Sequence, residues 1–200
     1  MNKYAPKKPN VLKNDNDYNK FMKATEAFEF EIPMKLALIY GLRQDELMVL
    51  EWPIVCFDKE QIEIKRGKAD TRVREKSGNR VRKEKTESRI VPFLPGVKEL
   101  LLRLKEQIEQ NKAKHKYRYK DSDLLSVDSF GGLPSIRKTM IWLELVCDKA
   151  ELPRISFDYI RQNRYYRLLN SDMPRSEVHK FMGFDPAYEP KTKYRKKKII

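Results

Sequence analysis

The sequence predicts a single α+β domain that is mainly helical and contains a small antiparallel β-sheet. Its 200 residues suffice for one compact domain, whereas a second full domain would be crowded. Apolar residues recur with helical spacing at both ends of the chain, and a period of two appears only in the middle. No internal repeat is visible.

The first segment, residues 1–14, is polar and contains two prolines and four lysines. This composition predicts a flexible basic arm or linker. A helix is expected next, capped by Asp15 or Asn16, because apolar residues follow one face through residues 18–28.

A second helix is predicted from near Pro33 to Gly41. Proline suits a first helical turn, where its missing N–H costs nothing, and glycine often ends a helix. A short third helix carries Glu46 and the apolar residues that follow it.

The middle of the chain predicts three strands. Residues 54–57 are extended and apolar, Ile62 and Ile64 alternate with polar residues, and residues 89–93 form the third segment. The intervening stretch 65–88 is strongly charged, which predicts a projecting hairpin or loop.

The remainder is helical in pattern. One helix is expected over residues 97–112 and another over residues 135–150, each with a single apolar stripe. Ser156 is a suitable N-cap for the next helix, and Pro174 and Gly183 bound the last one.

Composition favours a nucleic-acid partner. The chain has 43 Lys and Arg against 29 Asp and Glu, a net charge of +14. The longest apolar stretch, residues 36–40, is too short to span a bilayer, so we expect a soluble, cytoplasmic protein without a membrane partner. Cys56 and Cys147 have no neighbours at metal-ligand spacing and are predicted to be buried thiols, and two histidines do not suggest a metal centre.

Three separated segments carry a further signal. Residues 36–47 read LALIYGLRQDEL and residues 82–93 read RKEKTESRIVPF; residues 152–161 read LPRISFDYIR and are followed by VHKFMGF at 178–184. In order and spacing these segments resemble the signature blocks of the tyrosine recombinase or phage integrase family. The resemblance covers nearly the whole chain and implies that family's catalytic-domain fold.

The resemblance also implies functional roles. Arg43 and Arg161 correspond to the arginines that clamp the scissile phosphate, and Glu46 to a residue that supports the first of them. Lys85 corresponds to the lysine that protonates the departing 5′ oxygen, and Tyr194 to the nucleophile. The implied organisation is a catalytic domain over 15–190 and a basic tail, 191–200, that carries the nucleophile.

These residue types suit the chemistry. An arginine donates two hydrogen bonds to a phosphate and stays charged at working pH, although Arg43 or Arg161 could instead pair with a carboxylate such as Glu46. A lysine on a hairpin can act as a general acid. The basic neighbours of Lys85 are alternatives for that role: Lys76, Arg82 and Lys83.

Tyrosine is a poor nucleophile at neutral pH because the pKa of an unperturbed phenol is about 10. The surrounding lysines and arginine favour the phenolate of Tyr194 and would hold it against DNA. An exposed tyrosine in a basic tail is the simpler reading, and Tyr188 is a second candidate nucleophile.

Two positions depart from the family pattern. Asp158 stands where the family has the histidine three residues before its second arginine, and Phe184 stands in place of the later histidine or tryptophan. A carboxylate opposes the charge of a phosphate, and phenylalanine donates no hydrogen bond to it. Asp158 could instead cap a helix and Phe184 could belong to the core. His179 lies nearby but is not expected to take the catalytic role.

The sequence therefore predicts a site-specific DNA recombinase or integrase that cleaves and rejoins strands through a 3′-phosphotyrosine, as in phage or mobile-element integration and excision. The expected partner is double-stranded DNA, with a homo-oligomer assembled on it and with no cofactor, metal or small-molecule substrate. One alternative is a catalytically impaired DNA-binding regulator of the same fold. Another is an unrelated basic nucleic-acid-binding domain.

Overall fold

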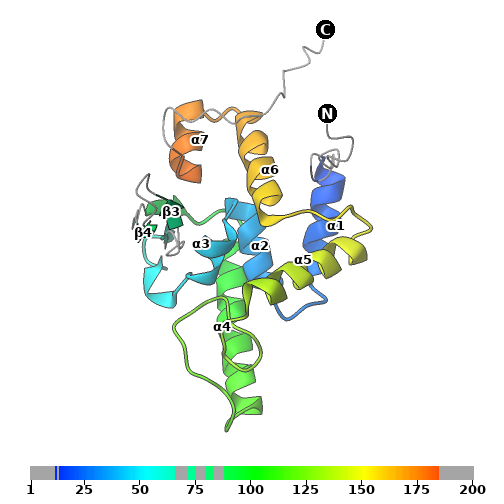
Figure 1. Ribbon diagram of the computed structural model, residues 1–200, viewed down its shortest axis with the longest axis vertical. Coiled ribbons are helices and arrows are strands. Elements are labelled where there is room, and N and C mark those ends of the chain that lie inside the picture. The colour runs from blue at the N-terminus through cyan, green and yellow to red at the C-terminus, as the bar shows by residue number, and fades with distance from the viewer. Residues whose placement is uncertain (1–11, 13, 66–71, 75–79, 83–87, 185–200) are drawn as a thin grey trace.

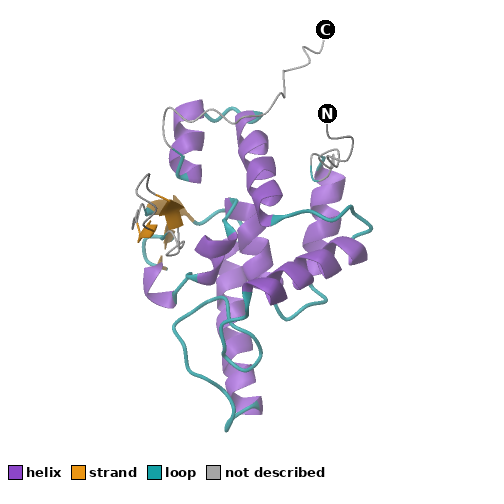
Figure 2. Ribbon diagram, viewed as in Figure 1, coloured by secondary structure: helices purple, strands orange, loops and turns teal. Residues whose placement is uncertain are grey.

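A computed structural model describes residues 12, 14–65, 72–74, 80–82 and 88–184. Within these ranges it is mainly helical with small antiparallel sheets, as predicted (Figures 1 and 2). The elements in chain order are α1 (Asp15–Thr25), α2 (Glu31–Tyr40), α3 (Gln44–Met48), the 3-10 turn η1 (Trp52–Ile54), β1 (Val55–Cys56), β2 (Gln61–Ile64), β3 (Arg72–Arg74), β4 (Arg80–Arg82), β5 (Arg89–Pro92), α4 (Val97–Lys114), α5 (Ile136–Lys149), α6 (Phe157–Leu169) and α7 (Arg175–Met182).

Helix α2 is the centre of the fold. Every one of its residues is buried, and it packs against α1, α3, α4 and α6. In Figure 1, α4 extends from this centre in one direction, α6 and α7 extend in the other, and α1 and α5 lie to one side. A helix that is surrounded in this way must also satisfy its own charged side chains internally.

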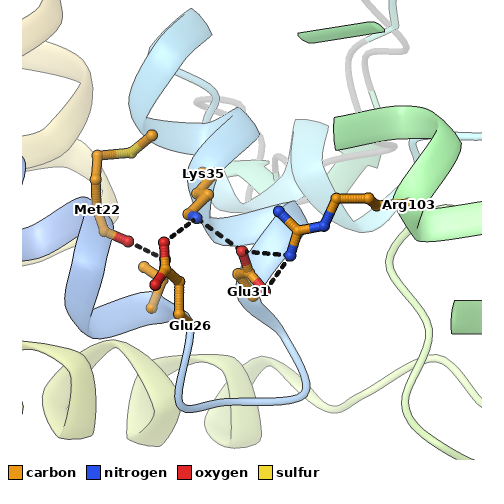
Figure 3. A network of polar contacts seen from close by, with 6 residues as sticks. Met22, Glu26, Glu31, Lys35 and Arg103 are labelled. Atoms are coloured by element: carbon orange, nitrogen blue, oxygen red, sulfur yellow. Dashed lines mark hydrogen bonds and ion pairs between the residues drawn. The ribbon is translucent and has the colours of Figure 1, made fainter. Parts of the chain in front are cut away.

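Glu31 and Lys35 are the charged residues buried in α2, exposed by 4% and 5%. Figure 3 shows how they are paired: the Lys35 ammonium lies 2.7 Å from Glu31 and 3.1 Å from Glu26. Arg103 of α4 donates to both carboxylate oxygens of Glu31 at 3.1 Å. This network joins α2 to α4 and to the loop after α1.

The main sheet has the strand order β1-β2-β5 and is antiparallel throughout. Ile62 and Ile64 face the core, which confirms the alternation predicted for β2. Ile62 pairs with Val91 in β5, so the residues that flank Val91 point away from it in alternation. Strands β3 and β4 pair with each other within the charged stretch, as the predicted hairpin requires.

Several predicted helix ends are confirmed. Gly41 and Gly183 end α2 and α7 with φ values of 61° and 63°, and Ser156 caps α6 by accepting from Tyr159 N at 3.2 Å. The predicted cap of α1 is wrong by one residue, because Asn14 accepts from Asp17 N at 2.7 Å.

Helices α6 and α7 enclose a second, smaller apolar cluster made by Tyr165, Leu168, Val178 and Met182. Because α7 also contacts β5, this cluster holds α7 against the main sheet. Of the described helices, none is long and apolar enough to cross a membrane.

Candidate active site

A pocket of about 850 Å³ opens where α3, α6 and the end of α7 meet the segment before α5. Four predicted site residues line it together: Arg43, Asp158, Arg161 and Phe184. Arg43 lies 115 positions before Asp158 in the sequence, so the fold brings the first and third family segments to one place. The remaining walls are Gln44, Asp45, Met48, Val49, Leu133, Pro134, Ser135, Ile136 and Gln162.

Arg43 immediately precedes α3 and is partly buried. Its backbone N–H donates to Glu46 Oε2 at 2.9 Å, which fixes the first turn of α3. Its guanidinium makes no hydrogen bond or ion pair with the part of the chain that the structure describes. An arginine that lines a pocket without an acceptor of its own is suited to binding an anion.

Glu46 joins several residues around the pocket and is only 1% exposed. Arg89 of β5 donates to its two oxygens at 2.6 and 3.0 Å, and Arg161 Nη1 lies 3.3 Å from Oε2. Burial by itself raises the pKa of Glu46, but the hydrogen bonds and charge of Arg89, the charge of Arg161 and the N–H of Arg43 outweigh it, so this pKa is lowered. Glu46 is therefore an ionised carboxylate that holds two guanidinium groups and one backbone segment.

Arg161 of α6 is 5% exposed, and much of its guanidinium is already engaged. Besides Glu46, it donates to the carbonyl oxygen of Gly41 at 2.8 Å and to that of Met182. The pairing of an arginine with Glu46, which the sequence left open, thus occurs at Arg161. The residue lines the pocket as a fixed positive wall and also fastens the ends of α2 and α7.

Asp158 is exposed and lies in the first turn of α6. The alternative that it caps this helix is wrong, because Ser156 performs that function. Asp158 instead lines the pocket together with Asp45. These two acidic residues carry the opposite charge to Arg43 and Arg161, which line the same pocket. The formal charges of the four lining residues balance, so a phosphate in this pocket would meet repulsion as well as attraction.

Phe184 follows the glycine that ends α7 and is partly buried. Its ring lies 4.7 Å from the guanidinium carbon of Arg161 and contacts Tyr165 edge-on at 5.2 Å. Phe184 thus belongs both to the small α6–α7 cluster and to the pocket wall. Where a histidine or tryptophan would offer an N–H, this side chain offers only an aromatic face to Arg161.

Arg89 was not identified from the sequence as a site residue. Its side chain is 8% exposed, and a Cβ placed on Gly183 would lie 2.9 Å from its Cδ, so the end of α7 rests on it. The available signal was its register in β5, two residues before the buried Val91 and hence on the inward face. Gln44 was also missed; it joins α3 to α5 by donating to Ile136 O at 3.0 Å and Thr139 Oγ1 at 2.6 Å.

Lys85 and Tyr194 lie outside the described residues, as do Tyr188, Lys76 and Lys83, so their predicted roles stay predictions. The same is true of the predicted arm and basic tail. His179 is buried 2.9 Å from the hydroxyl of Tyr165 and does not line the pocket. In the described ranges, no group of three or more His, Cys, Asp or Glu could hold a metal ion.

Comparison with solved structures shows the same fold at low sequence identity. XerA recombinase matches with a TM-score of 0.64 and 17% identity over 89% of this chain, and the Tn1549 transposon integrase in complex with circular intermediate DNA matches with 0.66 and 16% over 91%. The chain spans 57% and 60% of these two proteins. It spans 90% of the lambda integrase catalytic core, with a TM-score of 0.59 and 15% identity over 86% of this chain.

The fold is therefore that of tyrosine recombinase catalytic domains. No curated protein matches the sequence. The phage integrase family matches residues 12–197, which include all three segments singled out above. This chain belongs to the phage integrase family.

Proposed function

We propose that the chain is the catalytic domain of a site-specific DNA recombinase that cleaves and rejoins strands through a 3′-phosphotyrosine, as in the integration and excision of phages or mobile elements. The observation that supports this proposal is the pocket shared by Arg43, Asp158, Arg161 and Phe184 in a chain of this family. The partner would be double-stranded DNA in the cytoplasm, and a homo-oligomer would assemble on it.

In this mechanism the scissile phosphate would occupy the pocket. Arg43 would donate to its non-bridging oxygens, and the buried charge of Arg161 would stabilise the negative charge of the transition state. The phenolate of Tyr194 would attack phosphorus while Lys85 protonates the 5′ oxygen that leaves. Because the phosphodiester energy is kept in the phosphotyrosine bond, attack by a 5′ hydroxyl can restore the strand without a nucleotide cofactor.

The test is a covalent-trapping assay with a library of nicked duplexes, in which cleavage releases a short strand and prevents religation. The wild-type chain should form a protein–DNA adduct that survives denaturing electrophoresis. Tyr194→Phe should abolish the adduct, whereas the matched control Tyr188→Phe should retain it. An adduct that persists in Tyr194→Phe would contradict the assigned nucleophile.

A second candidate is a DNA-binding protein of the same fold that has lost cleavage. The carboxylate of Asp158 in the pocket and the engagement of Arg161 with Glu46 and two carbonyls favour it. In that case the wild type would bind duplex DNA but form no adduct. The double variant with Asp158→His and Phe184→His would then be expected to gain adduct formation, since it restores two donors to the phosphate.

A further inference from the structure

Helix α6 carries two more arginines beyond the one in the pocket. Arg164 and Arg167 follow Arg161 at intervals of three residues, but neither lines the pocket. Arg167 reaches α1 instead, where its Nη2 lies 2.5 Å from Asp15 and its guanidinium carbon lies 4.8 Å from the ring centre of Tyr18. These residues therefore form a separate basic surface between α1 and α6.

Arg164 is the unusual member of this group. It is partly buried, its guanidinium carbon lies 5.8 Å from the ring centre of Phe181, and a Cβ on Gly41 would lie 3.2 Å from its own Cβ. Within the described part of the chain its guanidinium makes no hydrogen bond or ion pair, and its buried Nε has no acceptor. A buried Nε without an acceptor is also found at Arg89, but the Nη atoms of Arg89 hold Glu46. The Nη atoms of Arg164 have no such partner among the described residues, so they are suited to binding a ligand.

The positive charges of this surface are only partly balanced by the described residues. Burial raises the pKa of Tyr18, while Arg164 and Arg167 both act to lower it, so both guanidinium groups lie near this phenol. Burial and the charge of Arg167 lower the pKa of Arg164, and no carboxylate opposes this effect. Asp15 is the acid paired here among the described residues, and its side chain is 83% exposed. One carboxylate therefore faces two arginines.

We propose that Arg164, Arg167 and Tyr18 form a second anion site, which binds a phosphate group of the DNA backbone beside the cleavage pocket. Guanidinium groups that rest on aromatic rings present their N–H edges to a ligand, and phosphate matches that edge with two acceptors. Arg161 and Arg167 are about 9 Å apart along the helix axis, six residues at 1.5 Å each, and about 120° apart around it, so the second site lies on another side of α6 from the pocket.

The inference rests on the proposed function only in taking duplex DNA as the source of the phosphate. It predicts a contact that positions the duplex without reading its sequence. Binding to a non-specific duplex tests it, and because no cleavage is measured, failure of this inference is distinguishable from failure of the proposed chemistry.

The experiment measures the affinity for a fluorescent non-specific duplex as a function of salt. For Arg164→Met the slope of log K against log salt concentration should fall by about 0.9, with an affinity loss of about eightfold at 0.1 M salt. Arg167→Gln should lower the salt slope and the affinity in the same way. The Arg167 side chain is 26% exposed, so this variant serves if Arg164→Met fails to fold. Arg154→Gln is the matched control, because this arginine is 61% exposed and already pairs with Glu144 and Asp148.

Inorganic phosphate provides the second arm. At matched ionic strength it should raise the Tm of the wild type more than that of Arg164→Met, since general salt effects act on both proteins. If phosphate stabilises the wild type more than Arg164→Met but the salt slope of DNA binding is unchanged in both variants, the DNA backbone is not the ligand of this site. The proposal would be overturned if Arg164→Met and Arg167→Gln kept the salt slope and the phosphate-induced Tm shift of the wild type. It would also be overturned if Arg154→Gln changed the slope as much as they do.

Discussion

Glu46→Gln is the most informative change to the core of the site, because it keeps the size of the side chain and removes its charge. Arg89 and Arg161, with side chains 8% and 6% exposed, would then be left without their shared counter-ion. Breaking a buried ion pair by removing one partner typically costs about 3–5 kcal/mol. For a domain of this length that corresponds to a fall in Tm of roughly 10 °C.

The pH dependence gives this prediction a sign. The pKa of Glu46 is lower in the folded chain than its ordinary value, so the ionised form stabilises the fold. This contribution is fully present above the unfolded pKa of about 4.3 and is lost as pH falls through the lower folded value. The difference in unfolding free energy between wild type and Glu46→Gln should therefore be largest near neutral pH and shrink in acid.

Urea unfolding followed by tryptophan fluorescence at a series of pH values measures both effects. The matched control is Glu60→Gln, which removes the charge of an exposed glutamate paired with Lys98 at 2.9 Å and should cost far less, because solvent screens this pair. If Glu46→Gln loses no more than this control at neutral pH, or if its loss does not change in acid, Glu46 is not the counter-ion of the two buried arginines.

Three further predictions, which need five substitutions, test other parts of the structure by the same unfolding measurement. Lys35→Met should cost about 2–4 kcal/mol, because among the described residues Glu31 then keeps Arg103 alone as a partner; a loss below 1 kcal/mol would refute the buried network. Gly131→Ala should destabilise more than Gly96→Ala, since an added Cβ lies 2.1 Å from Lys120 O at the first position and meets nothing within 4 Å at the second, where only the left-handed φ costs about 1 kcal/mol; equal losses would contradict the packing. Ser156→Ala should cost about 1 kcal/mol through the lost cap, whereas Asp158→Ala should leave stability nearly unchanged, and the reverse order would restore Asp158 as the cap.

The sequence predicts helix ends better than it predicts the contacts within the site. Ser156 accepts from a residue three positions away, and Gly183 ends α7 through its own φ value. Such interactions are local, and the residue types that make them are few, so spacing alone is sufficient. The one-residue error at α1 arose because three adjacent residues, Asn14 to Asn16, are all good caps and only the backbone decides between them.

Ion pairs between residues far apart in the sequence could not be predicted from local patterns. Glu46 was expected to support Arg43, and it does so through a backbone N–H, but its bidentate partner is Arg89, forty-three positions away. Arg161 lies 115 positions from Glu46. Periodicity predicts that a residue faces inward, but it does not predict which charged residue lies next to it in the core.

The sequence by itself determined the family and the order of the helices and of strands β1, β2 and β5, because these follow from local patterns and from the spacing of motifs. Tertiary structure alone decided that Arg43, Asp158, Arg161 and Phe184 share one pocket and that Arg161 is already engaged. It also decided that Arg164 finds no acceptor among the described residues. The physical reason is that the effect of a buried charge depends on the groups that surround it in space, and packing brings those groups from distant parts of the chain.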